Sequence, residues 1–277
     1  MAGFLEILVY VGGSIAFALV ALLVTKKFAK PIDVKETADF LLASVTIVGT
    51  LVSVVLGLLV STSVDRYREM ESCVDNEATT VAAIYRNARG LPHDPRFILQ
   101  SLCIEYCDHA VNDEWPDMRS GKMSDALTIT YGKLNDAIAA LHPADLGQAN
   151  LQQSMLTAAS KVAESRRDRL VFIKSDWMQR LLPILVVSAL IVLAITYMYV
   201  DSKPSRLQGI LVSFVAIALG SNIGVIIMLS RPFSGSWSIE PETFAANAKF
   251  MREYLHVDDA VLHEEGEGRA KHPDGDH

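Results

Sequence analysis

The sequence contains few cysteines, no excess of basic residues and no recognisable catalytic motif. Its three cysteines, Cys73, Cys103 and Cys107, are too few to build a disulfide framework, and this is typical of a protein in a reducing compartment. Acidic residues outnumber basic residues by 32 to 25, and the formal charge of −7 argues against a nucleic-acid partner.

Catalytic and phosphate-binding motifs are also missing. The chain has no Gly-rich phosphate loop, no Ser/His/Asp set and no HExxH motif, and we interpret its paired carboxylates as surface charge. We therefore expect no enzymatic activity and no cofactor.

Two groups of residues deserve comparison with metal sites. Cys103 and Cys107 lie one helical turn apart beside His109, but a zinc site needs four ligands. Four acidic residues gather near one expected helix end, where a calcium site would need several converging oxygens. They are Asp108, Asp113, Glu114 and Asp117. We interpret these carboxylates as solvated on a helix surface and expect no metal.

Charge is absent from four long apolar runs. They are Ile7–Val24, Phe40–Val64, Leu181–Val200 and Leu207–Leu229, and none contains Asp, Glu, His, Lys or Arg. A helix of about 20 apolar residues spans a bilayer, so each run predicts a membrane span. Pumps and many coupled transporters place ionisable groups inside their spans, and the absence of such groups disfavours that class.

The fold expected from these runs is all-α, with four transmembrane helices and a helical cytosolic insert between the second and third spans. The expected parts are a first membrane hairpin (1–64), the insert (65–180), a second hairpin (181–230), a post-membrane turn and helix (231–257) and a disordered acidic tail (258–277). A mean hydropathy of +0.27 fits this mixture of apolar spans and a polar insert.

The insert shows helical periodicity in four segments. We expect them at Val74–Ala88, from Asp94 to a stop at Glu114-Trp115-Pro116, at Ser124–Leu141 and at Ala144–Arg180, with a further helix near Thr243–Leu255. No glycine or proline separates Val64 from the first of these helices, or Gln148 from the third span. We therefore expect both membrane helices to continue out of the bilayer as unbroken helices, and Pro183 to lie near the start of its span.

Small and hydroxylated residues form a stripe on the second span. This small-residue stripe comprises Thr46, Gly49, Thr50, Ser53, Gly57 and Ser61. Gly49, Ser53, Gly57 and Ser61 recur at every fourth position, which keeps them on one face of the helix, and Thr46 and Thr50 lie alongside them. Such a face allows another helix to approach closely, or it lines a path for ions, and the sequence leaves both alternatives open.

Two other features near the membrane have structural and functional alternatives. Gly220, Asn222 and Gly224 in the fourth span are expected to support helix packing through an interhelical hydrogen bond of Asn222, with a permeation role as the alternative. Arg66, directly after the second span, anchors the helix at the interface or concentrates anions at a pore mouth.

The distribution of basic residues near the spans favours a cytoplasmic insert. Ten Lys and Arg flank the spans on the side of the insert and both termini, against six on the other side. The first span alone indicates the opposite orientation, and the free cysteines favour the cytoplasmic insert. We expect a multi-pass protein of the inner (plasma) membrane.

The chain resembles the bestrophin-like integral membrane family of bacteria and plants. Short segments carry the resemblance, in order, over about residues 40 to 245. They are Leu56-Gly57-Leu58-Leu59 running to Tyr67, Asn76-Glu77-Ala78, Leu91-Pro92, Tyr106, Glu114-Trp115-Pro116, Arg166-Arg167 with Arg169 and Leu170, and Arg231-Pro232-Phe233-Ser234-Gly235.

This family is distantly similar to the bestrophins, which are oligomeric anion channels with the second span at the pore. The resemblance implies a homo-oligomer, a pentamer or similar, that conducts small inorganic ions, with anions favoured and no calcium gating. It implies pathway roles for Thr46, Thr50, Ser53, Gly57, Ser61 and Arg66. The alternative is a non-conducting membrane sensor or scaffold that acts through its cytosolic helices.

Overall fold

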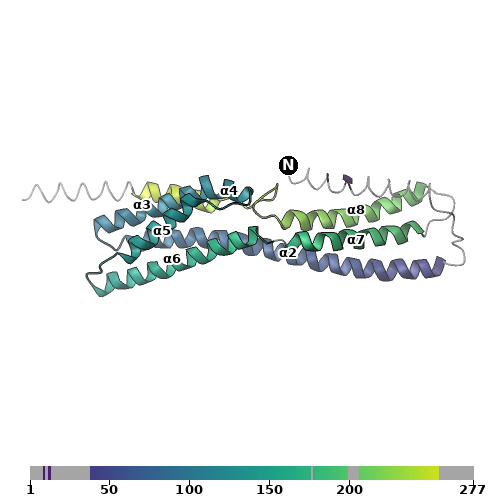
Figure 1. Ribbon diagram of the computed structural model, residues 1–277, viewed down its shortest axis with the longest axis horizontal. Helices are drawn as coiled ribbons and strands as arrows, with labels where there is room; N and C mark the ends of the chain where they lie inside the picture. Colours follow the sequence, from purple (N-terminus) through teal and green to yellow (C-terminus); the bar gives the residue numbers. More distant parts are fainter. Residues whose placement is uncertain (1–8, 10–11, 14–37, 176, 199–205, 256–277) are drawn as a thin grey trace, which may run out of the picture. The chain divides into compact units, whose positions relative to one another are not determined.

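A computed structural model describes residues 9, 12–13, 38–175, 177–198 and 206–255. All regular elements in these residues are helical, which confirms the expected all-α class. The chain divides into two compact units, 1–69 with 175–238 and 70–174 with 239–277 (Figure 1). The expected first span lies almost entirely outside the described residues, and the expected tail lies wholly outside them.

The longest element is α2 (Ala38–Ala88), a single helix of 51 residues. It contains no proline, and its apolar run passes directly into Asp65, Arg66 and the helix of the insert. The expected unbroken helix from this apolar run into the insert is therefore confirmed. Residues up to Glu69 belong to the first unit, and those from Met70 onward belong to the second.

The first unit packs α2 against α7 (Trp177–Met198) and α8 (Arg206–Leu229). Leu56 of α2, Leu185 of α7 and Ile226 of α8 form one buried cluster. Among the described residues, α2 and α8 are long and apolar enough to cross a membrane, whereas the apolar part of α7 is shorter, Arg180–Thr196.

The expected continuous helix from the insert into the third span is wrong. Helix α6 (Leu146–Ile173) ends at Lys174, and α7 begins at Trp177. The sequence between them contains Ser175 and Asp176, residue types that favour helix N-caps over helix interiors. Because α7 starts four residues before the apolar run, Pro183 lies inside the helix and not near its first turn.

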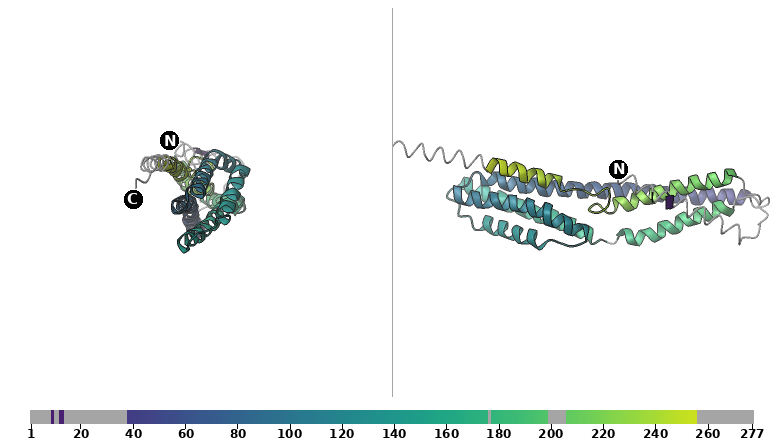
Figure 2. Two further views of the ribbon diagram at one scale, coloured as in Figure 1. Left: turned by 90° about the vertical axis from the view of Figure 1, so that its left-hand side faces the viewer. Right: turned by 90° about the horizontal axis from the view of Figure 1, so that it is seen from above.

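The second unit is a bundle of helices around one apolar core (Figure 2). Besides the second half of α2 and α6, it contains α3 (His93–His109), the π-helix η1 (Ala110–Glu114), α4 (Trp115–Arg119), α5 (Asp125–Ala139) and the helix at 242–255. The expected helix near Thr243–Leu255 is confirmed.

Local cap residues determine where α5 and α6 begin. The Ser124 hydroxyl accepts a hydrogen bond from Leu127 N, and the Asp145 carboxylate accepts one from Gln148 N. Each side chain satisfies an amide that the first helical turn leaves unpaired. These contacts place the start of α6 at Leu146, two residues after the expected start at Ala144.

The expected helix stop at Glu114-Trp115-Pro116 is also wrong. After α3, the chain makes one π-turn, in which Trp115 N donates to Ala110 O, and then continues as α4. Pro116 is tolerated because it occupies the second position of α4, close to a helix start. The extra residue of the π-turn changes which side chains face the core, and both Glu114 and Trp115 become buried.

The helix at 242–255 lies along the second half of α2 (Figure 2). The Tyr85 hydroxyl donates to Met251 O at 2.9 Å, and Asn247 Nδ2 donates to Ala78 O at 2.9 Å. Phe244 is fully buried and its ring contacts Trp115 edge-on. These contacts fix the post-membrane helix to the bundle of the second unit.

Gly235 closes the turn that follows α8. Its φ is +93°, in the left-handed region where a Cβ is disfavoured. By contrast, Gly132 lies inside α5, and a Cβ added there would meet nothing within 4 Å. The backbone conformation therefore favours glycine at position 235, whereas no described contact requires glycine at position 132.

We expect Gly235→Ala to lower the free energy of unfolding by about 1 to 3 kcal/mol, because alanine is strained at this φ. The matched control, Gly132→Ala, should raise stability by up to about 1 kcal/mol, because alanine is the better helix former. Thermal unfolding of the full chain in detergent, followed by circular dichroism, measures both changes. Equal shifts of the two variants would contradict the assignment.

Candidate functional site

The small-residue stripe of α2 lies on an exposed face of the first unit. Thr46, Thr50, Ser53, Gly57 and Ser61 are all exposed, and Gly49 is half-buried. The face that packs on α7 and α8 instead carries larger apolar residues. They are Val52, Leu56, Leu59 and Val60. At 3.6 residues per turn, the stripe is centred about 90° around the helix from Leu56, and Gly49 is its member nearest the packed face.

No packing among the described residues explains the two stripe glycines. A Cβ added to Gly49 or to Gly57 would meet no atom within 4 Å. A glycine inside a helix destabilises it by about 1 kcal/mol relative to alanine. A shallow groove of about 520 Å³ runs over this face, between Val45 and Val54. Within the described residues, the space beside Gly49 is therefore open.

The hydroxyl groups of the stripe differ in whether they already donate a hydrogen bond within α2. Thr46 Oγ1 donates to Leu42 O at 2.8 Å, and Thr50 Oγ1 donates to Thr46 O at 2.7 Å. Within the described part of the chain, Ser53 and Ser61 make no such hydrogen bond, so their hydroxyl hydrogens remain available to a ligand.

Arg66 lies against an aromatic ring at the end of the apolar run. Its guanidinium carbon is 4.8 Å from the ring centroid of Trp177, the first residue of α7. This cation–π contact holds an exposed positive charge in one place and uses a residue type typical of membrane interfaces. The sequence predicted the charge of Arg66 but did not identify Trp177 as its partner.

The three residues singled out in α8 are more enclosed than the stripe. Gly224 is buried, whereas Gly220 and Asn222 are half-buried. Asn222 Nδ2 donates to Ala218 O at 2.8 Å, within its own helix. This differs from the interhelical hydrogen bond that we expected, because the short Asn side chain reaches the carbonyl one turn earlier.

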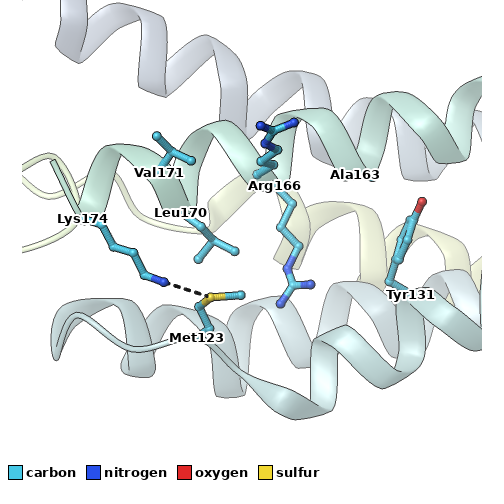
Figure 3. Close-up of a pocket in the computed structure, with 8 residues that line it drawn as sticks. Met123, Tyr131, Ala163, Arg166, Leu170, Val171 and Lys174 are labelled. Atoms are coloured by element: carbon cyan, nitrogen blue, oxygen red, sulfur yellow. Dashed lines mark hydrogen bonds between the residues drawn. The ribbon is translucent and has the colours of Figure 1, made fainter.

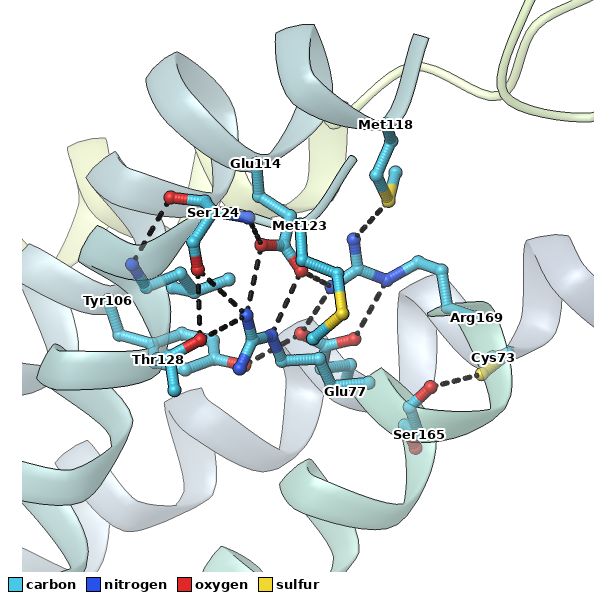
Figure 4. A network of polar contacts seen from close by, with 12 residues as sticks. Cys73, Glu77, Tyr106, Glu114, Met118, Met123, Ser124, Thr128, Ser165 and Arg169 are labelled. Atoms are coloured by element: carbon cyan, nitrogen blue, oxygen red, sulfur yellow. Dashed lines mark hydrogen bonds and ion pairs between the residues drawn. The ribbon is translucent and has the colours of Figure 1, made fainter. Parts of the chain in front are cut away.

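A buried ionic network forms the centre of the second unit (Figure 4). Arg169 is fully buried, and its Nη2 and Nε donate to Glu77 at 2.9 and 3.2 Å. Arg166 donates to Glu114 through Nε at 2.9 Å and through Nη2 at 3.0 Å. Arg169 Nη2 also lies 3.6 Å from Glu114 Oε1, so two carboxylates and two guanidiniums form one neutral group.

Neighbouring side chains satisfy the remaining polar atoms of this network. Tyr106 Oη donates to Glu77 Oε1 at 2.8 Å, and Ser124 N donates to Glu114 Oε2 at 3.0 Å. The Arg169 guanidinium lies 4.7 Å from the Trp115 ring centroid. Further partners are the Met118 sulfur for Arg169, and the Ser124 carbonyl and Thr128 hydroxyl for Arg166.

Burial dominates the proton affinities in the network. It raises the pKa of Glu77, and Arg169 and the Tyr106 hydroxyl oppose this rise. Burial also raises the pKa of Tyr106, which stays a neutral donor. For Arg166, burial acts to lower the pKa, but the hydrogen bonds and charge of Glu114 raise it above its ordinary value. The two arginines and Tyr106 therefore act as donors to Glu77 and Glu114.

The interpretation of the acidic group as surface charge is wrong for Glu114, which is fully buried, as is Glu77. The acidic group near the end of α3 is also dispersed. Asp108 pairs with Arg252, and Asp113 pairs with His109. Among the residues that the structure describes, no group of three or more His, Cys, Asp or Glu side chains is arranged to hold a metal ion.

Comparison with known families now assigns the chain. The sequence pattern of the bestrophin-like domain matches residues 12–244. The chain belongs to the bestrophin-like family. Four segments that carried the resemblance contain Glu77, Tyr106, Glu114 and the Arg166/Arg169 pair, and these residues meet in the buried network.

Solved structures share the fold of this bestrophin-like chain. A bacterial bestrophin homologue from Klebsiella pneumoniae with an isoleucine-to-threonine mutation has a TM-score of 0.64 at 12% identity, over 89% of this chain and 99% of the other. The form with alanine at the same position has a TM-score of 0.55 at 13% identity, and the match covers 91% of this chain and 96% of the other. Comparison with curated protein sequences gives no match.

We expect Glu114→Gln to destabilise the bestrophin-like chain by about 3 to 5 kcal/mol, because the change leaves the buried Arg166 charge without its partner. The matched control is Arg119→Gln, which breaks the exposed ion pair with Glu240 and should cost about 0 to 1 kcal/mol. Chemical denaturation of the detergent-solubilised chain compares the two. Similar losses in both variants would show that the buried network does not stabilise the unit.

The cysteines give a second test of the same bundle. Burial, and next the Glu77 charge, raise the pKa of Cys73 from 9.0 to about 11, and its thiol donates to Ser165 O. At pH 8 this leaves about a hundredfold less thiolate than at an unperturbed thiol. Native iodoacetamide labelling of Cys73 should therefore be slow and should accelerate as the pH rises towards 11.

Cys103 and Cys107 are buried and should react only after unfolding. Equal native labelling of all three would contradict this bundle.

Proposed function

We propose that the chain assembles into a homo-oligomeric ion channel, with α2 beside the central axis and anions as the permeating ions. The observation that carries the proposal is the position of the small-residue stripe. Five of its six residues are exposed, and none of the six belongs to the cluster that packs α2 on α7 and α8. A pentamer or a similar ring follows by analogy with the bestrophins.

The stripe glycines leave space that no described residue fills, and this favours a further neighbour for α2. Two interior glycines cost α2 about 2 kcal/mol in helix propensity, and no described residue uses the space they leave. Copies of α2 around an axis would use it, because small residues let helix backbones approach closely or leave room for an ion path.

The hydroxyl geometry indicates which stripe residues would contact an anion. Thr46 and Thr50 already donate their hydrogens to carbonyls of α2. Ser53 and Ser61 are exposed and can donate to a partly dehydrated anion. In this proposal the two serines are ligands, whereas Thr46, Thr50 and Gly57 shape the path.

Arg66 would supply positive charge at one end of this path. A ring of such charges raises the local concentration of anions. Its contact with Trp177 restricts the side chain to one region, which favours a fixed ring over scattered charges. In this proposal Gly49, Gly220, Asn222 and Gly224 serve helix packing.

The proposed setting is the inner (plasma) membrane, with four spans and with the insert and both termini in the cytoplasm. Lipids, further copies of the chain and small inorganic ions are then its partners. The function requires no catalysis, cofactor, metal or nucleic acid. The continuous α2 joins the proposed pathway covalently to the buried network of the second unit.

Flux measurements on purified chain in liposomes test the channel. Ser53→Leu and Gly57→Leu should each reduce chloride flux at least about tenfold, because leucine fills the path of every subunit. Ser53→Ala should lower chloride permeability, whereas Thr46→Val should change it little.

The matched control for added bulk is Val55→Leu on the exposed apolar face of α2. Native mass spectrometry confirms that each variant keeps its subunit count. Undiminished flux in both leucine variants would remove α2 from the pathway. A wild-type chain that is monomeric, or that passes no ion, would instead support a non-conducting sensor or scaffold.

A further inference from the structure

A second cavity lies in the second unit, between α5 and α6 (Figure 3). Its volume is about 330 Å³, near the lower end of the range of small-molecule sites. Its apolar lining includes Met123, Leu170 and Val171. The three charged residues that line it are Arg166, Arg167 and Lys174, and no carboxylate joins them.

The cations of this cavity have unused hydrogen-bonding capacity. Arg167 and Lys174 are exposed, and neither forms an ion pair within the described part of the chain. The ammonium group of Lys174 contacts the Met123 sulfur at 3.7 Å, and a thioether is only a weak acceptor. Arg166 uses Nε and Nη2 for its hydrogen bonds, whereas Nη1 takes part in none of them.

The cavity is also close to the membrane along the chain. Lys174 precedes Trp177, the first residue of the apolar helix α7, by three residues, which span at most about 11 Å. Tryptophan is typical of the membrane interface, so Lys174 would lie near the headgroups if α7 enters the bilayer. Met123 and Val171, both exposed apolar side chains, border the same cavity.

We propose that this cavity binds the phosphate of an anionic phospholipid. The phosphate accepts hydrogen bonds from Arg167, Lys174 and Nη1 of Arg166, and the glycerol and first methylene groups contact Leu170 and Val171. The charge and polarity of the cavity suit this ligand, because basic pockets beside membrane spans recognise anionic headgroups. The proposal depends on α7 entering the membrane, and it does not depend on ion conduction.

Native mass spectrometry of the full chain in neutral detergent tests this site. Phosphatidylglycerol should bind more tightly than phosphatidylcholine. The double variant Arg167→Gln/Lys174→Gln should lower the affinity for the first bound phosphatidylglycerol molecule about tenfold or more. The charge-matched control is Lys161→Gln/Lys249→Gln, two exposed lysines of the same unit outside the cavity. It should leave binding within about twofold, since its lysines do not reach the site.

A second variant tests the shape of the cavity. Ala163→Leu fills the space beside Arg166 without changing the charge of the cavity. It should also lower the affinity for the first bound phosphatidylglycerol molecule. Equal losses in the cavity and control variants, or no preference over phosphatidylcholine, would overturn the proposal. Full displacement by millimolar glycerol 3-phosphate would also overturn it and assign the site to a soluble phosphate. Lipid binding is scored separately from flux, so a non-conducting chain can still pass this test.

Discussion

The pairing of Arg169 with Glu77 is the interaction on which the second unit depends. Both side chains are fully buried, and an unpaired charge in that position would cost several kcal/mol. Their hydrogen bonds join α2 to α6 across 92 residues of sequence, and Glu114 joins the π-turn to the same group. The network therefore determines which helices are neighbours, and the apolar core fills the space around it.

The network also explains why irregular backbone is kept in a helical unit. One extra residue in η1 rotates Glu114 and Trp115 into the core, where they contact Arg166, Arg169 and the chain at Ile239. A regular α-helix through the same segment would present these side chains in a different direction. Ser124 contributes twice, because it caps α5 and its backbone binds both Glu114 and Arg166.

The two units use polar groups in opposite ways. In the second unit, charges are buried and paired within the chain. In the first unit, five of the six stripe residues of α2 are exposed, and Arg66 beyond the stripe contacts the Trp177 ring. A site completed by further copies of the chain needs such a free face, whereas a stable internal support needs satisfied charges. Because α2 runs through both units, one helix serves the proposed pathway and the internal support.

The sequence by itself determined the all-helical class, the unbroken course of α2 and the charge-free runs. These features depend on neighbours within a few residues, and composition and spacing report them directly. Only the tertiary structure decided that Glu77 and Glu114 are buried, and that the stripe lies outside the cluster that packs α2 on α7 and α8. The pairing of a carboxylate with an arginine 52 or 92 residues away depends on how the helices pack, and no local pattern of residues encodes that distance.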